Sequence, residues 1–202
     1  MLGLPQSTEV KRQLPKAQIY QKFELKASQR EAFDNDVSKM EIVNFISPQT
    51  VPAISEGDEV KAIFVVDVEL KNKEFDPKNF ILISKMIPQK IIFQLHFEDQ
   101  TQLAIFHTKL FTGSWFREDQ KISLLGLNFD DVWDNFVSQI SGLIIEENSD
   151  IETSIEKEQR RTDINKQIES LQKQLKNCNQ NRKQLELFHE IKKLKKELKE
   201  IK

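Results

Sequence analysis

Residues 60–70 read Val-Lys-Ala-Ile-Phe-Val-Val-Asp-Val-Glu-Leu. The β-branched and apolar residues of this stretch are typical of a strand that is buried on both faces of a sheet. Asp76-Pro77 then predicts a helix start, because aspartate caps a helix and proline fits its first turn. Residues 91–97 predict a second strand, joined to the first by a right-handed crossover. We therefore expect an α/β fold, with α+β as the alternative, in which helices flank a mixed central sheet.

Further elements are predicted on both sides of this unit. The capping-box pattern Ser28-Gln29-Arg30-Glu31 indicates a helix start, and Asp130-Asp131 begins an amphipathic pattern that Gly142 closes. Glu98 to Thr101 has the composition of a hairpin turn. The remaining predicted elements are a helix over 16–23, the helix from Ser28 to about residue 38, and strands over 41–46, 102–111 and 121–125.

Composition divides the chain into two parts. All glycines and prolines precede residue 143, so the following segment has the composition of long helix. Residues 151–202 carry a net charge of +5, whereas residues 1–150 carry −7. We expect a globular domain over 1–148 and a helical segment over 149–202, with different binding partners for the two.

The helical segment has the spacing of a coiled coil. Five positions follow a 4-3-4-3 pattern: Ile164, Ile168, Leu171, Leu175 and Cys178. A second apolar series starts in a new phase: Leu185, Phe188, Ile191, Leu194, Leu198 and Ile201. Asparagines around residues 177–181 weaken the helix between the two series. These features predict an antiparallel hairpin of two helices, over about 152–176 and 182–201.

The second predicted helix is rich in lysine. Candidate contacts for nucleic-acid phosphate or for an acidic partner are Arg182, Lys183, Lys192, Lys193, Lys195, Lys196 and Lys199. Two alternatives remain open at this point. Interleaved glutamates can neutralise the lysines on a solvated face, or the apolar seam can pair with a second copy to give a homodimer.

Most catalytic classes lack support in the sequence. A single cysteine excludes a disulfide framework, and no glycine pattern resembles a phosphate-binding loop. His96 and His107 match no metal-binding spacing, so we expect structural roles for them and neither a metal nor a cofactor. The N-terminus has no signal-peptide pattern and no apolar run spans a membrane, which predicts a cytoplasmic protein without membrane contact. Trp115, in a predicted loop, is the aromatic residue expected to be most exposed.

One catalytic alternative is a magnesium-dependent nuclease. Glu69 and Lys71 have the Glu-x-Lys spacing of such enzymes, in which the carboxylate holds Mg²⁺ and the lysine steadies the attacking water. Asp58 or Asp67 would supply a second carboxylate, and Glu31 a helical one. The same acid-x-lysine spacing recurs at several other positions, so the strand context of Glu69 carries the hypothesis.

Motifs across the chain resemble a known family. They are Met1-Leu2-Gly3-Leu4-Pro5 with Ser7-Thr8 and Val10, Leu14-Pro15-Lys16, Ile87 to Phe93, Lys109, Asn181-Arg182-Lys183 with Glu186-Leu187, and Lys192 to Lys195. In these motifs the chain resembles the prokaryotic domain of unknown function 4391, although Gln184 and Phe188-His189 depart from its pattern. The resemblance implies an accessory role beside helicases and DNA methyltransferases in restriction-like or antiviral defence loci. It transfers no catalytic residue. We expect a non-catalytic subunit that binds a helicase-like or methyltransferase partner, DNA, or both.

Overall fold

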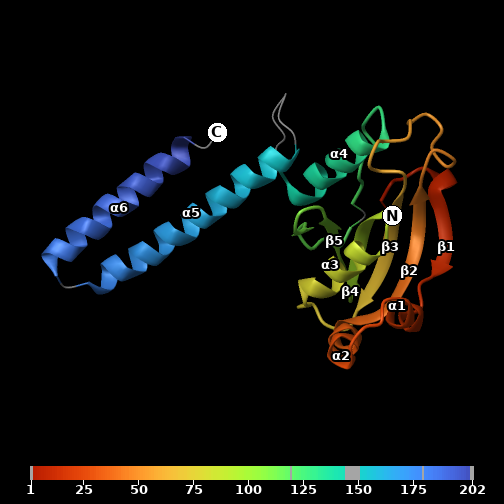
Figure 1. The fold of residues 1–202 in the computed structure, drawn as a ribbon, viewed down its shortest axis with the longest axis horizontal. Coiled ribbons are helices and arrows are strands. Elements are labelled where there is room, and N and C mark those ends of the chain that lie inside the picture. The colour runs from red at the N-terminus through yellow and green to blue at the C-terminus, as the bar shows by residue number, and fades with distance from the viewer. Residues whose placement is uncertain (1, 119, 144–150, 179, 201–202) are drawn as a thin grey trace. The chain divides into compact units, whose positions relative to one another are not determined.

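The structure is a computed structural model that describes residues 2–118, 120–143, 151–178 and 180–200. It divides into two compact units, residues 1–142 and 143–202, which we describe separately. The boundary expected between residues 148 and 149 lies outside the described residues. Figure 1 labels the elements of both units.

The first unit contains a mixed sheet, as expected, and the sheet has six strands. Its strands are β1 (Glu9–Gln13), β2 (Val37–Ile46), β3 (Ile63–Leu70), β4 (Lys90–Phe97), β5 (Gln100–Phe106) and β6 (Leu110–Thr112). Their order in the sheet is their order in the chain. All neighbouring strands are antiparallel except β3 and β4, which are parallel.

Helices cover the sheet. They are a 3-10 turn (Gln6–Thr8), α1 (Lys16–Lys22), α2 (Ala27–Asp36), α3 (Pro77–Met86) and α4 (Phe129–Ser141). The predicted start of α3 is confirmed, because the Asp76 side chain accepts a hydrogen bond from the Lys78 backbone N–H, and Pro77 is the first helical residue. Gly142 ends α4 in the left-handed conformation, as its position predicted.

Both faces of the central strands are packed. Val66, Val68 and Leu70 of β3 belong to the core cluster that also contains buried residues of α1, α2 and α3. Side chains alternate along a strand, so Ile63 and Val65, both fully buried, point to the other face. Helix α4 buries Trp133 and Phe136 and packs against β5 and β6.

Two sequence predictions of strands were wrong, and one strand was not predicted. The segment 102–111 is two strands, because the chain turns at residues 107–109 and β6 pairs back onto β5. Residues 121–125 form no strand; instead the Ser123 backbone bonds to the side chain of Gln139. β1 was not predicted, because its polar residues are mostly exposed at the sheet edge.

Two element starts also differ from prediction. Helix α2 begins at Ala27, one residue before the predicted Ser28, since the Lys26 backbone N–H donates to Gln29 Oε1 over 3.0 Å. It ends at Asp36, and β2 starts at once at Val37 rather than at residue 41. The chain therefore turns directly from helix into strand.

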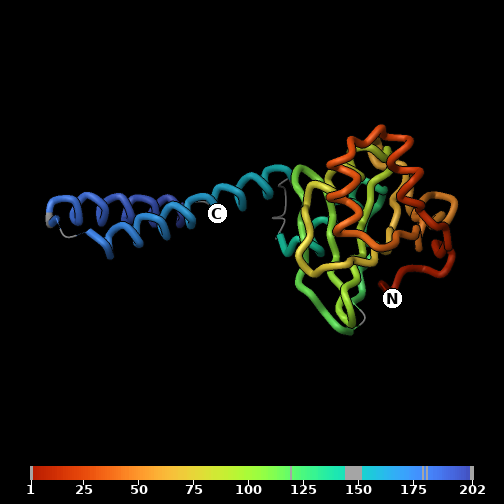
Figure 2. Tube along the Cα trace, turned by 90° about the horizontal axis from the view of Figure 1, so that it is seen from below, coloured from red at the N-terminus to blue at the C-terminus, as the bar shows by residue number. Residues whose placement is uncertain are grey.

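The second unit is the predicted helical hairpin, formed by α5 (Ile151–Asn177) and α6 (Asn181–Glu200). The two helices lie side by side in both views (Figures 1 and 2). Three isoleucines are buried between the two helices: Ile164, Ile168 and Ile191. Four partly buried leucines pack against them: Leu171, Leu175, Leu194 and Leu198. Cys178 is half-buried, and Ile201 lies outside the described residues.

The predicted seam of α6 was wrong at two positions. Leu187 is buried at 7% exposure, whereas Leu185 and Phe188 are 61% and 57% exposed. The seam of α6 therefore runs through Leu187, Ile191, Leu194 and Leu198 with 4-3-4 spacing, which continues one face of the helix. Leu185 and Phe188 lie on a different face.

A single carboxylate holds the loop that leads into β3. Asp130, in the first turn of α4, accepts hydrogen bonds from the backbone N–H groups of Asp58 (2.6 Å), Val60 (2.7 Å) and Glu59 (3.2 Å). Gly57 is so close that a side chain there would collide with the carboxylate. Burial acts to raise the pKa of Asp130, but these backbone donors and Lys61 lower it, and the net shift is downward.

We predict that Asp130→Ala lowers the free energy of unfolding by about 1–3 kcal/mol at pH 7, because three loop amides lose their acceptor. Because the pKa of Asp130 is depressed, the stabilisation is fully present at pH values above the usual pKa of aspartate. It is lost as the pH falls through the pKa that Asp130 has in the native protein. Urea unfolding at several pH values measures this. Asp99→Ala, at an exposed ion pair with Arg117, is the control and changes stability by less than about 0.5 kcal/mol. Equal stability of wild type and Asp130→Ala at pH 7 would contradict the prediction.

Candidate functional site

Asp67 and Glu69 lie near the carboxyl end of β3, on the face opposite the α1–α3 core. Asp67 Oδ1 lies 3.3 Å from His96 Nε2 of the neighbouring strand β4, and both side chains are about one-third exposed. The other imidazole nitrogen, Nδ1, is 3.0 Å from Thr101 Oγ1 on β5. Thr101, His96 and Asp67 therefore lie in a row across three adjacent strands, with a hydrogen bond between Thr101 and His96 and a close approach of His96 to Asp67.

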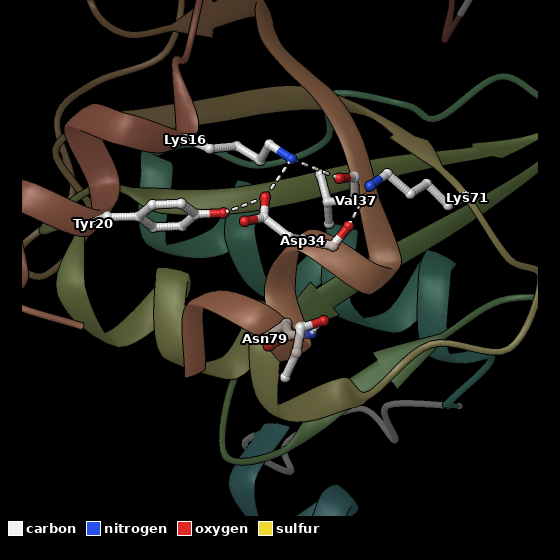
Figure 3. Close-up of polar contacts among 7 residues, drawn as sticks. Lys16, Tyr20, Asp34, Val37, Lys71 and Asn79 are labelled. Atoms are coloured by element: carbon white, nitrogen blue, oxygen red, sulfur yellow. Dashed lines mark hydrogen bonds and ion pairs between the residues drawn. The ribbon is translucent and has the colours of Figure 1, made fainter. Parts of the chain in front are cut away.

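Lys71 does not join this group. It lies just beyond the end of β3, and its Nζ donates to the backbone carbonyl of Asp34 over 2.5 Å (Figure 3). Its own backbone N–H donates to the carbonyl of Asp36 over 2.8 Å. Lysine is favourable at a helix C-terminus, where carbonyl groups lack helical partners. Lys71 thus caps α2, and its ammonium group is engaged there rather than with Glu69.

The same helix end holds a second polar group. Asp34 Oδ1 accepts hydrogen bonds from Lys16 Nζ (2.6 Å) and from the Tyr20 hydroxyl (2.7 Å) (Figure 3). The hydrogen bond from Lys16 and then that from Tyr20 lower the pKa of Asp34. Burial, followed by the hydrogen bond to Asp34, raises the pKa of Tyr20. Lys16 also donates to the Val37 carbonyl, so this network ties α1 to the junction of α2 and β2.

Asp58 and Glu31 are also separate from Asp67 and Glu69. Asp58 precedes β3, and the six residue steps from Ile63 to Glu69 span roughly 20 Å in a strand. Glu31 lies on α2, which packs on the opposite face of the sheet. Among the residues that the structure describes, no three His, Cys, Asp or Glu side chains form a group that could hold a metal ion. The nuclease constellation is therefore not assembled in this structure.

A cavity of about 550 Å³ adjoins Asp67. Its polar lining includes Asn44, Asp67 and Gln94, and its apolar lining includes Leu4 and Val43. Such a lining suits a small molecule with hydrogen-bond donors. Sequence analysis missed this cavity because its lining comes from the N-terminal segment and four different strands.

His107 and Trp115 make contacts that hold elements of the first unit together. Nε1 of Trp133 donates to His107 Nδ1 over 3.2 Å, which links α4 to the chain between β5 and β6. Trp115 is partly buried against the core, with Lys73 Nζ 5.3 Å from its ring centre. The expectation that Trp115 is the most exposed aromatic residue was wrong, since Phe188 is 57% exposed.

The surface of α6 separates into stripes. Positions three and four residues apart lie on one helix face. One series, which we call the basic stripe, consists of Leu185, Phe188, Lys192, Lys195 and Lys199, all exposed. A second series, the acidic stripe, consists of Glu186, Glu190, Lys193, Glu197 and Glu200. The glutamates of α6 are thus gathered away from the basic stripe.

Few lysines of α6 are neutralised. Lys196 lies 3.7 Å from Glu200, and Arg182 lies 3.6 Å from Glu186. Glu197 of the acidic stripe pairs across the hairpin with Arg160 of α5 over 2.8 Å. Within the described part of the chain, Lys192, Lys195 and Lys199 form no ion pair. The interpretation that interleaved glutamates neutralise this face is therefore weakened.

Comparison with known proteins identifies one family. The family model described as Domain of unknown function (DUF4391) matches residues 2–198. No curated protein and no solved structure matches the chain. None of the helices in the described ranges combines the length and apolar character needed to cross a bilayer.

We predict that Lys71→Met lowers the free energy of unfolding by about 0.5–1.5 kcal/mol, because the C-terminal carbonyl of α2 loses a charged donor. Lys11→Met, at an exposed position of β1, is the matched control and leaves stability within about 0.5 kcal/mol. Urea unfolding of the full chain measures both variants. Identical midpoints for Lys71→Met and wild type would show that Lys71 does not cap the helix.

Proposed function

The chain belongs to the DUF4391 family, and we propose that it is a non-catalytic accessory subunit of a DNA-targeting system, restriction-like or antiviral, that binds nucleic acid through the hairpin. The observation that carries this proposal is the basic stripe, whose three lysines are exposed and lack ion pairs among the described residues. Unpaired lysines on one helix face are free to contact phosphate.

The spacing of these lysines suits a phosphate backbone. A helix rises 1.5 Å per residue, so Lys192, Lys195 and Lys199 follow one another at about 4.5 and 6 Å along the axis. Each phosphate that a lysine neutralises releases a counterion, which makes binding strongly dependent on salt. The acidic stripe gives the hairpin one face that repels nucleic acid, so the contact has a defined orientation.

The competing functions have less support. The apolar seams of α5 and α6 are buried against each other within one chain, so they offer little surface for the homodimer considered from the sequence. Three residues of the nuclease alternative lie away from Asp67 and Glu69; they are Glu31, Asp58 and Lys71. No described observation favours either function over binding.

We propose that a protein partner binds the surface of the first unit. Residues 1–142, which form this unit, carry a net charge of −4, which disfavours contact with phosphate. We place the contact with a helicase-like or methyltransferase partner on this acidic unit, in line with the role that the family resemblance implies.

We predict that the triple variant Lys192→Gln/Lys195→Gln/Lys199→Gln binds a labelled DNA oligonucleotide at least tenfold more weakly than wild type near 0.1 M salt. The slope of log affinity against log salt should fall by about 3 in magnitude for a duplex, one unit for each lost phosphate contact. Fluorescence anisotropy at several salt concentrations measures both quantities.

The matched control is Lys166→Gln/Lys173→Gln/Lys193→Gln, which removes the same charge from exposed positions outside the basic stripe. It should retain most of the affinity. Equal losses in the two triple variants would indicate diffuse attraction rather than a stripe. Failure of wild type to bind any oligonucleotide would contradict the nucleic-acid part of the proposal.

We also predict that a helicase or methyltransferase encoded beside this protein co-elutes with the full chain in size-exclusion chromatography. The triple variant of the basic stripe should co-elute equally well, because the contact is placed on the first unit. If neither the helicase nor the methyltransferase forms a complex with the full chain, the partner assignment is contradicted.

A further inference from the structure

Two large apolar residues occupy one end of the basic stripe. Leu185 and Phe188 are 61% and 57% exposed and continue the line of Lys192, Lys195 and Lys199. We propose that this stripe takes single-stranded nucleic acid, with a base stacked on Phe188 and the neighbouring phosphates held by the lysines. This inference rests on the proposed function and specifies its ligand.

The exposure of Phe188 is unusual for this chain. Within the described residues, the large apolar side chains of comparable exposure are its neighbour Leu185 and, in a loop of the first unit, Leu125 and Leu127. The ring of His189 lies beside Phe188, with centroids 6.4 Å apart and planes at 76°. The hairpin thus presents aromatic surface where a helix facing only water would carry polar residues.

The combination of aromatic and basic residues distinguishes a single strand from a duplex. In a duplex the base faces are covered by their neighbours, and a protein that reads the backbone needs only charge and hydrogen bonds. In a single strand the base faces are accessible and stack on aromatic side chains, while lysines follow the backbone. Phe188 has a role in the second case and none in the first.

Charge complementarity argues against other occupants of the stripe. A helical partner, or a second copy in a coiled coil, requires apolar residues at most positions of the contact, yet three of the five positions are lysine. Insertion into a membrane interface requires a wide apolar face, and this one has two apolar residues. A flexible polyanion with exposed aromatic bases matches both the apolar end of the stripe and its lysines.

The test compares labelled oligothymidine and oligouridine of about 15 nucleotides with a duplex of equal length, by fluorescence anisotropy on the full chain. We expect tighter binding of the single strands at equal salt. Phe188→Ala should weaken single-strand binding about 5- to 30-fold and change duplex binding less than twofold. Phe188→Trp should restore single-strand binding, because stacking is retained.

Leu127→Ala is the control for loss of an exposed apolar side chain away from the hairpin and should leave both affinities unchanged. Circular dichroism should show unaltered helix content in Phe188→Ala, since the side chain lies outside the seam. The relative affinity for DNA and RNA strands then shows which sugar the site prefers.

Three outcomes would overturn the inference. Equal affinity for single strands and duplex, with no effect of Phe188→Ala, would leave the proposed function standing and remove the single-strand assignment. Binding to phosphatidylserine vesicles without binding to oligonucleotides would assign the stripe to a membrane surface. A dimer mass in light scattering that Phe188→Ala abolishes, without oligonucleotide binding, would assign it to a second copy. In the last two cases the proposed function fails together with the inference.

Discussion

The parallel pairing of β3 with β4 is the constraint on which the first unit depends. Two parallel neighbours cannot be joined by a tight turn, so the chain must cross over through α3. The apolar side chains on both faces of β3 then require cover on both sides, and α1 to α3 supply it on one face. Helix α4 packs against β5 and β6. Asp130 completes this arrangement, because it ties the first turn of α4 to the loop that leads into β3.

Much of this architecture was predictable because its signals are local. β3 is a continuous apolar run, α3 starts at an aspartate followed by proline, and Gly142 closes α4. The remaining elements depend on pairing over longer distances. β1 carries mainly exposed polar residues and is a strand only because β2 offers an unpaired edge. The turn at residues 107–109 contains neither glycine nor proline, so no residue type marked the end of β5.

The residues proposed for function also show that spacing in the sequence does not by itself decide where a side chain lies. Lys71 has the correct spacing from Glu69, but the strand ends at Leu70 and the lysine turns to the carbonyl groups of α2. In α6 two series with 3-4 spacing run beside each other, one through Leu187 and Ile191 and one through Leu185 and Phe188. Spacing alone cannot decide between them. Packing against Ile164 and Ile168 decides, and it leaves Phe188 exposed.

The sequential order of the strands also determines how the sheet ends. Its two outer strands are β1, with five residues, and β6, with three. Long, flat outer strands offer unpaired backbone groups to other chains and promote aggregation, whereas short ones offer few, and charged residues such as Lys11 and Arg12 of β1 discourage such pairing further. The sheet therefore offers few backbone groups through which a further chain could extend it.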